Sequence, residues 1–176
     1  EKIGVDYLAI ARLKEGLKLR SEGIKLPIMS LGVEFGINIE ASIANDIELS
    51  VSSTENLLEI EDIAYKMAKI AKIHLKVDTG MSRLGAMPDI VLTMAKKIAE
   101  SKNLEFTSLY THLARSEESK DFTEKQIDIF KDAQKKLENI GLIPKFFHIY
   151  NSGAILDSYR ADENYAVRPG IMAYGY

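Results

Sequence analysis

The sequence predicts an α/β fold built on a parallel sheet. Short apolar runs typical of strands alternate with longer segments whose apolar residues recur every three or four positions. Parallel strands need crossover connections, and the helical segments supply them. No Gly/Ser-rich or Pro-rich linker interrupts the alternation. We therefore predict one domain over residues 1–176.

Seven apolar runs are the predicted strands. They are Tyr7–Ile10, Pro27–Leu31, Ile47–Val51, Ile73–Lys76, Phe106–Tyr110, Phe147–Ile149 and Tyr165–Val167. A (β/α)8 barrel of the TIM type takes about 250 residues, and ~200 can suffice. We predict an incomplete barrel of this type, with about seven parallel strands in 176 residues. A doubly wound open sheet is the alternative, but its Gly-x-Gly-x-x-Gly phosphate turn does not occur in the sequence.

Helices are predicted between most of these strands. Three follow from apolar spacing and helix-end residues: Arg12–Glu22, Thr54–Ile70 and Asp89–Ser101. Thr123 and Gln126 match a capping box, so a fourth helix is predicted to begin there and to end at Gly141. A short fifth helix is predicted with Ser152 as its N-cap.

Composition excludes several classes of protein. Lys and Arg number 23 against 26 Asp and Glu, a net charge of −3, which argues against a nucleic-acid partner. No cysteine is present, so neither disulfides nor a thiolate metal site can form. No apolar run approaches the roughly 18 residues of a membrane span, and no signal peptide is visible. We expect a cytoplasmic protein without membrane partners.

The stretch Lys76–Gly85 is the most informative motif. It reads Lys-Val-Asp-Thr-Gly-Met-Ser-Arg-Leu-Gly and follows a predicted strand. Charged side chains at the carboxyl end of such a strand lie where barrel active sites assemble. A lone loop Lys or Arg is usually just hydrated. The whole string instead indicates that Lys76 and Arg83 belong to a site.

A histidine ends another predicted strand, within Tyr110–Ala114. His112 can stack on an aromatic cofactor or be a satisfied core residue. His74 and His148 are predicted to be core histidines. The three lie on separate predicted strands without a second ligand nearby, so no metal site is predicted.

Two more motifs follow the last two predicted strands, where barrel phosphate sites are often built. Asn151–Ala154 offers a helix start as an anion site, and a plain helix cap is the alternative. Arg168 precedes a Pro-Gly turn, in which Gly170 lets the backbone approach a ligand. A hydrated arginine beside a turn is the alternative there.

Together these motifs resemble the barrel domain of the alanine racemase family, and the resemblance runs over essentially the whole chain. Lys-x-Asp-Thr-Gly-Met-x-Arg-Leu-Gly is highly specific, and Arg-Pro-Gly-Ile followed by Tyr-Gly adds to it. The resemblance implies the cofactor pyridoxal 5′-phosphate (PLP) and interconversion of L- and D-alanine, which supplies D-alanine for peptidoglycan. It also implies a homodimer.

The resemblance also assigns roles to residues. Arg168 would face the PLP pyridine nitrogen, and His112 would stack on the ring. Arg83 would bind the phenolic oxygen of the cofactor and lie near the substrate carboxylate. Lys76 matches a lysine that many members carry as a carbamate, which would support Arg83. The phosphate-binding positions map onto Asn151, Ser152, Gly170 and Ile171.

Two catalytic groups of the family have no match here. The Schiff-base lysine lies in a Lys-x-x-Ala-Tyr-Gly motif at the end of the first strand, and this motif does not occur in the sequence. The opposing base is a tyrosine on a separate β domain. We therefore expect a fragment without the first strand and the C-terminal β domain, inactive alone, whose intact parent racemises alanine.

Three alternatives remain open. The parent could be another PLP racemase of the same fold, acting on serine, lysine or arginine. It could be a single-domain PLP-binding protein of cofactor homeostasis without racemase activity. A folding module with a vestigial site is disfavoured, because five site residues occur together: Lys76, Arg83, His112, Ser152 and Arg168.

Overall fold

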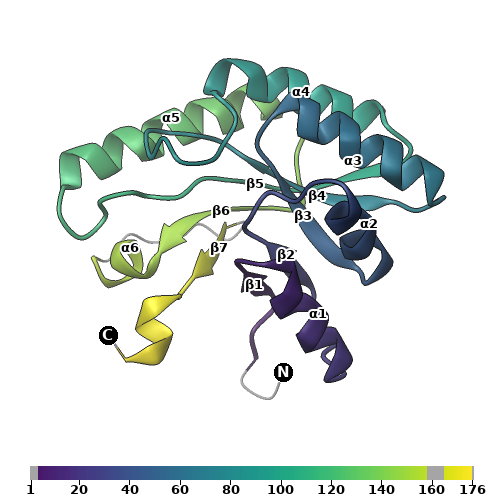
Figure 1. The fold of residues 1–176 in the computed structure, drawn as a ribbon. Coiled ribbons are helices and arrows are strands. Elements are labelled where there is room, and N and C mark those ends of the chain that lie inside the picture. The colour runs from purple at the N-terminus through teal and green to yellow at the C-terminus, as the bar shows by residue number, and fades with distance from the viewer. Residues whose placement is uncertain (1–3, 158–164, 176) are drawn as a thin grey trace. The chain divides into compact units, whose positions relative to one another are not determined.

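The computed structural model describes residues 4–157 and 165–175. Its strands follow one another through a single sheet in the order β1-β2-β3-β4-β5-β6-β7 (Figure 1). A doubly wound sheet would reverse its strand order at a switch point, and the described strands show no reversal. Sequential order with parallel pairing is that of a (β/α)8 barrel, so the predicted fold class is confirmed.

The strands lie where the apolar runs predicted them, with ends shifted by a few residues. They are β1 Leu8–Ile10, β2 Ile28–Ser30, β3 Ile47–Val51, β4 Ala71–Lys76, β5 Leu104–Tyr110, β6 Phe146–Asn151 and β7 Tyr165–Arg168. The helices are α1 Leu13–Ser21, α2 Ile37–Ala44, α3 Thr54–Lys66, α4 Pro88–Glu100, α5 Lys120–Glu138, α6 Ser152–Leu156 and the 3-10 turn η1 Ile171–Tyr174.

Three details of the helix prediction were wrong. No helix was predicted over α2, whose N-cap Gly36 offers no side chain as a signal. The capping box was wrong because α5 begins at Lys120, so Thr123 and Gln126 lie inside the helix. The N-cap of α6 is Asn151 rather than Ser152, since the Asn151 side chain accepts the backbone N–H of Ala154.

The chain forms two compact units. Unit 1 comprises residues 1–74 and 97–106, and unit 2 comprises residues 75–96 and 107–176. The one-domain interpretation of residues 1–176 stays a prediction. No helix in the described part of the chain is long and apolar enough to cross a membrane.

Unit 1 is held by a small aliphatic cluster under α1. Its buried members are Ile10, Leu13, Ile28 and Ile47. Gly16 of α1 is also buried. A Cβ added to Gly16 would lie 2.7 Å from Cδ1 of Ile10 and 2.8 Å from Cδ1 of Ile47. Glycine is therefore what allows α1 to lie this close to the strands, because a larger residue would overpack the core.

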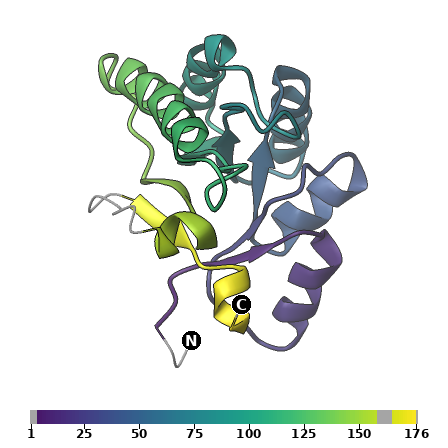
Figure 2. The same cartoon turned by 90° about the vertical axis from the view of Figure 1, so that its left-hand side faces the viewer.

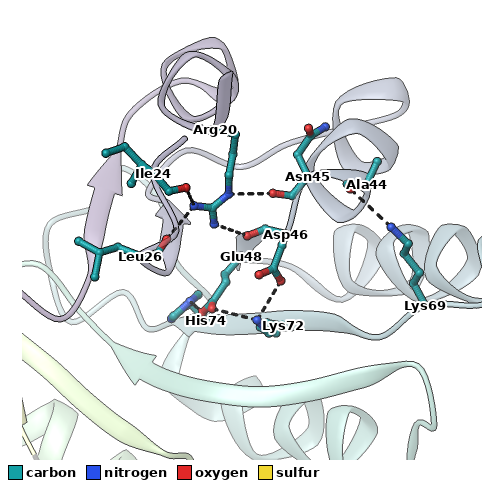
Figure 3. A network of polar contacts seen from close by, with 10 residues as sticks. All are labelled: Arg20, Ile24, Leu26, Ala44, Asn45, Asp46, Glu48, Lys69, Lys72 and His74. Atoms are coloured by element: carbon teal, nitrogen blue, oxygen red, sulfur yellow. Dashed lines mark hydrogen bonds and ion pairs between the residues drawn. The ribbon is translucent and has the colours of Figure 1, made fainter. Parts of the chain in front are cut away.

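Arg20, in the last turn of α1, joins three segments of unit 1 (Figure 3). Its NH1 donates to the carbonyl oxygens of Ile24 at 2.9 Å and Leu26 at 2.7 Å, just before β2. Its Nε and NH2 donate to the carbonyl oxygens of Asn45 at 3.0 Å and Asp46 at 2.8 Å, just before β3. One guanidinium thus satisfies four main-chain acceptors that the helices and strands leave unpaired.

His74 of β4 is a buried, paired core histidine, as predicted. Its Nε2 lies 2.8 Å from Oε2 of Glu48 on β3, and both side chains are at most 2% exposed. Lys72 lies at the rim of this pair, with its Nζ 3.6 Å from Oε1 of Glu48 and 2.9 Å from Oδ1 of Asp46 (Figure 3).

Unit 2 places its last three strands side by side. β5 pairs with β6 and β6 with β7, all parallel, and His148 of β6 lies opposite Tyr110 of β5 and Ala166 of β7. Phe130 of α5 contacts the ring of Phe147 edge-on, at a centroid distance of 6.3 Å. Figure 2 shows α6, β7 and η1 of this unit close together. Parallel pairing brings the carboxyl ends of these strands to the same edge.

Candidate active site in unit 2

The four sequence motifs meet in unit 2, at the carboxyl ends of its strands. Lys76 is the last residue of β4, Asn151 ends β6 and Arg168 ends β7, while His112 follows β5 by two residues. Asn151 and Arg168 are direct partners in the β6–β7 pairing. Segments far apart in the chain therefore deliver their polar residues to the same edge of the sheet, as predicted for a barrel active site.

Arg168 is held by the main chain of the neighbouring strands. Its NH2 donates to the carbonyl oxygen of Thr111 at 2.7 Å and to that of Ile149 at 3.3 Å. Its NH1 donates to the carbonyl oxygen of His148 at 2.9 Å and to Nδ1 of the same residue at 2.5 Å. None of these bonds uses Nε. Burial lowers the pKa of Arg168 to about 10, so the guanidinium still carries its charge at neutral pH.

The bond from Arg168 fixes the tautomer of His148. Arginine only donates, so Nδ1 of His148 must be the unprotonated acceptor. Its proton therefore sits on Nε2, which donates to Oγ of Ser108 at 2.9 Å. The imidazole also stacks on the ring of Tyr110, with centroids 4.4 Å apart and planes inclined by 6°. His148 is thus buried as predicted, but it supports the site, which the sequence analysis missed.

Lys76 and Arg168 both lie close to the aromatic ring of Tyr110. Nζ of Lys76 lies 5.6 Å from the centroid of Tyr110, and Cζ of Arg168 lies 5.7 Å from it. Cations over a phenol ring are attracted by its quadrupole. Burial, with Arg83 and Arg168 nearby, lowers the pKa of Lys76 to about 8, against the opposing effect of Asp78. A buried, partly deprotonated amine is a nucleophilic one.

His112 is neutral at physiological pH. Burial lowers its pKa to about 4, and the positive charges of Arg168, Lys76 and Arg83 contribute in that order. A neutral imidazole in this setting can offer its flat face to an aromatic group without adding to the positive charge. The structure therefore brings together the four residues assigned to the ring and carboxylate end of the site.

The backbone of the loop that carries Arg83 is held in place at both ends. Oδ1 of Asp78 accepts the backbone N–H groups of Gly80 at 2.9 Å and Ser82 at 3.0 Å. At the other end Gly85 has φ +137°, and a Cβ there would lie 2.6 Å from the backbone nitrogen of Asp78. Only glycine fits this position. The Arg83 side chain is exposed at the tip of a loop whose backbone path is fixed.

Two of the residues predicted to bind phosphate lie close together. Oγ of Ser152 accepts the backbone N–H of Met172 at 3.3 Å, and a Cβ added to Gly170 would lie 3.9 Å from that Oγ. Ile171 lies between Gly170 and Met172 and is 59% exposed. The start of α6 and the start of η1 therefore face each other, with a hydroxyl group between them.

Asn151 plays a structural part in this region. Its Nδ2 donates to the carbonyl oxygen of Leu113 at 3.1 Å. Its Oδ1 accepts Oγ of Ser116 at 2.8 Å and the backbone N–H of Ala154 at 3.2 Å. Both ends of the amide are thus used to cap α6 and to tie it to the segment after β5. The phosphate role of Asn151 stays a prediction.

No group of three or more metal-ligating side chains occurs in residues 4–157 and 165–175. The charge balance of the site instead favours an anionic organic ligand. Lys76, Arg83 and Arg168 bring positive charge, and Asp78 is the carboxylate that acts on Lys76 in the opposite sense. Buried charges need partners. PLP carries a phosphate and a phenolic oxygen, and its flat ring suits the neutral face of His112, so the residues present fit this cofactor.

Comparison with known proteins decides the family. The family model described as alanine racemase, N-terminal domain, matches residues 1–176. The chain belongs to the alanine racemase family. Its members depend on PLP, in agreement with the charge balance and with the cofactor prediction.

Individual relatives agree with this assignment. The alanine racemase of Treponema denticola is 38% identical over 99% of the chain, and that of Methanococcus maripaludis is 42% identical over 98%. The solved structure of the Clostridium difficile alanine racemase covers 99% of the chain with a TM-score of 0.95 at 37% identity. The chain spans about half the length of these relatives: 47%, 46% and 49% of them, respectively.

The candidate site contains residues that were not assigned from the sequence. Tyr110 and His148 support Lys76 and Arg168, and Gln126 of α5 contacts the loops after β4 and β5. No local motif marks them. The available signal was the position of His148 near the end of its predicted strand, but its role depends on the pairing register with β5 and β7.

Proposed function

We propose that the whole protein is a PLP-dependent alanine racemase, and that this chain provides the residues that bind the cofactor and orient the substrate. The observation that carries the proposal is the cluster of Lys76, Arg83 and Arg168 around the neutral His112 within one unit. The names of its relatives support the reaction, and the dependence of the family on PLP supports the cofactor.

Arg168 would face the pyridine nitrogen of PLP. A guanidinium has donors but no acceptor, so it cannot take a proton from the ring, and its charge disfavours a protonated pyridine. Bound PLP would supply the electron-withdrawing ring that makes the α-proton of an amino acid acidic. Arginine in place of a carboxylate moderates that effect, which limits side reactions of the activated substrate.

The remaining residues would hold the ligands in place. Arg83 would bind the phenolic oxygen and orient the substrate carboxylate, and His112 would lie against the ring. Lys76 has a pKa lowered to about 8, so a useful fraction of its amine is uncharged and able to add carbon dioxide. The resulting carbamate would be an anion between two arginines. Ser152, Gly170 and Ile171 would bind the phosphate, with Asn151 behind them.

Alanine is the proposed substrate, and D-alanine for peptidoglycan the proposed use of the product. We further infer that the protein works as a homodimer in the cytoplasm. The name shared by the relatives supports alanine as the substrate. Racemases for serine, lysine or arginine and a PLP-binding protein without racemase activity are the outcomes that a test must separate.

The test uses the product of the full-length gene, loaded with PLP and assayed by chiral chromatography. Alanine should racemise in both directions, and faster than serine, lysine or arginine. Arg83→Met should lower kcat/KM by ~10–100-fold, the value of charged hydrogen bonds to the ligand. Arg115→Met is the matched control, because Arg115 is another exposed loop arginine of unit 2, ion-paired with Glu118 at 3.1 Å.

A different preferred amino acid would contradict the proposed substrate but not the reaction. PLP binding without racemisation of any of these amino acids would contradict the reaction and favour a role in cofactor homeostasis. Equal losses in the Arg83 and Arg115 variants would contradict the role given to Arg83.

A further inference from the structure

We propose that Gln126 is a positioning residue that fixes the loop carrying Arg83 against the segment carrying His112. Gln126 lies on α5 and is 0% exposed. The inference rests on the proposed function for its catalytic readout. Its structural readout is independent of that function.

The side-chain amide of Gln126 reaches both loops at once. Nε2 donates to Oγ1 of Thr79 at 3.1 Å, three residues beyond the end of β4. The same nitrogen donates to the carbonyl oxygen of His112 at 3.3 Å. Oε1 accepts the backbone N–H of Ala114 at 2.9 Å. A carboxamide has two N–H donors and one acceptor oxygen, so all three bonds need this side-chain type.

The hydrogen bonds from Gln126 continue as a chain in which each group donates to the next. Oγ1 of Thr111 donates to the carbonyl oxygen of Val77 at 2.8 Å, so it must act as acceptor in its 2.9 Å contact with Oγ1 of Thr79. Thr79 therefore donates to Thr111 and accepts from Gln126. Both threonines are at most 3% exposed. Hydrogen bonds in such a buried chain strengthen one another, so losing its first donor weakens every later link.

Helix α5 also packs directly against the loop that carries Arg83. Gly80 has φ +128°, and a Cβ added to it would lie 3.3 Å from Cζ of Phe122 and 3.9 Å from Cγ of Gln126. Phe122 precedes Gln126 by one turn of α5. The loop therefore rests on two consecutive turns of the helix, and the amide of Gln126 sets its distance from His112.

This arrangement explains how Arg83 and His112, which lie in two different loops, are held in a fixed relative position. Arg83 lies four residues beyond Thr79, inside the stretch pinned by Asp78, and His112 is bound through its own carbonyl oxygen. Small displacements of catalytic groups have large effects on rate. Gln126 would act on the reaction through these two residues, without touching cofactor or substrate.

The test compares Gln126→Met with Gln134→Met in the full-length protein loaded with PLP. Gln134 lies two turns further along α5, donates to Oε1 of Glu138 at 2.8 Å and accepts the hydroxyl of Tyr165. It is a glutamine of the same helix that contacts neither loop. Gln126→Met should lower kcat for alanine by ~10–100-fold with little change in KM. It should also speed amide hydrogen exchange at Ala114 by at least about tenfold. Gln134→Met should change neither.

A second variant separates the contribution of the Nε2 donors of Gln126 from that of its Oε1 acceptor. It also provides the test if Gln126→Met does not fold. Gln126→Glu keeps an oxygen for the N–H of Ala114 but has no donor for Thr79 or for the carbonyl of His112. It should leave the exchange at Ala114 slow and still lower kcat. A thermal shift equal to that of Gln134→Met, together with the kcat loss, would support positioning over a general effect on the fold.

The proposal is overturned if Gln126→Glu, and Gln126→Met where it folds, keep kcat/KM within about twofold of the Gln134→Met value. A full-length protein that binds PLP but racemises no amino acid would instead refute the proposed function. The exchange measurement then decides the positioning role alone: protection at Ala114 equal in Gln126→Met and Gln134→Met overturns it, and faster exchange in Gln126→Met supports it.

Discussion

Replacing Arg20 by methionine removes one cation and leaves four main-chain acceptors without their donor. Methionine keeps an unbranched apolar stem at this position of α1, so the packing of the stem changes little. Two of the four lost bonds, to Ile24 and Leu26, are partly buried, and the two to Asn45 and Asp46 are exposed (Figure 3). At about 1.5 kcal/mol for each partly buried bond and about 0.5 kcal/mol for each exposed one, the sum is about 4 kcal/mol.

Water can reach the exposed carbonyl groups in the variant and replace part of this loss. We therefore expect the free energy of unfolding to fall by about 2–4 kcal/mol. A typical domain has only about 5–15 kcal/mol in total, so the effect is large. Urea unfolding followed by circular dichroism measures it, with the midpoint compared at an unchanged slope.

Lys66→Met is the control for loss of a surface charge. Lys66 of α3 forms one exposed ion pair with Asp62, at 2.5 Å. Such pairs contribute about 0–1 kcal/mol. If Arg20→Met costs no more than Lys66→Met, the four carbonyl contacts contribute nothing beyond surface charge and the reasoning fails.

Three further predictions concern the site. The pKa of Lys76 is about 8 in the folded chain against 10.5 in the unfolded one, so the unfolded state binds more protons between these two pH values. The free energy of unfolding should therefore rise from pH 8 to 10.5. Unfolding measured across this pH range should show a flatter rise for Lys76→Met. His112 has a folded pKa of about 4 against 6.5, so stability should fall as pH drops from 6.5 to 4; a His112 imidazole titrating by NMR near 6.5 would contradict this. Gly85→Ala should lower the free energy of unfolding by about 1–3 kcal/mol and weaken PLP binding, because φ of Gly85 is +137° and the added Cβ would collide with the backbone nitrogen of Asp78. Thermal unfolding measures the stability and fluorescence titration measures the PLP affinity. An unchanged PLP affinity would show that this loop is not part of the site.

The sequence predicts strands here better than it predicts helix ends. Residues Ile47–Val51 alternate apolar and polar side chains, and this two-residue period is recognisable as a strand without knowledge of its neighbours. The helix α2 has no such signal, because Gly36 caps it with backbone alone. Gln126 shows a different limit: its spacing from Thr123 matches a capping box, yet both lie inside α5, and the amide points to loops distant in sequence.

The residues of the candidate site also differ in how far the sequence reveals them. Lys76, Arg83 and Arg168 stand in local motifs whose residue order carries the information. His148 stands in no motif, and its role arises because pairing places it opposite Tyr110 and within reach of Arg168. Asn151 and Ser152 are adjacent, and only the backbone angles decide which of them caps α6.

The anchoring of Arg168 has a consequence for how this chain tolerates mutation. Three of its four bonds end on the main-chain oxygens of Thr111, His148 and Ile149. A substitution replaces a side chain and leaves the carbonyl where it was. Sequence drift at Thr111 and Ile149 can therefore proceed without breaking a bond to the guanidinium, provided that the strands keep their register. A substitution at His148 keeps the bond to its carbonyl oxygen but removes the bond to its Nδ1. The contacts of Gln126 with Thr79 offer no such protection, because a single substitution removes a side chain on which the bond depends.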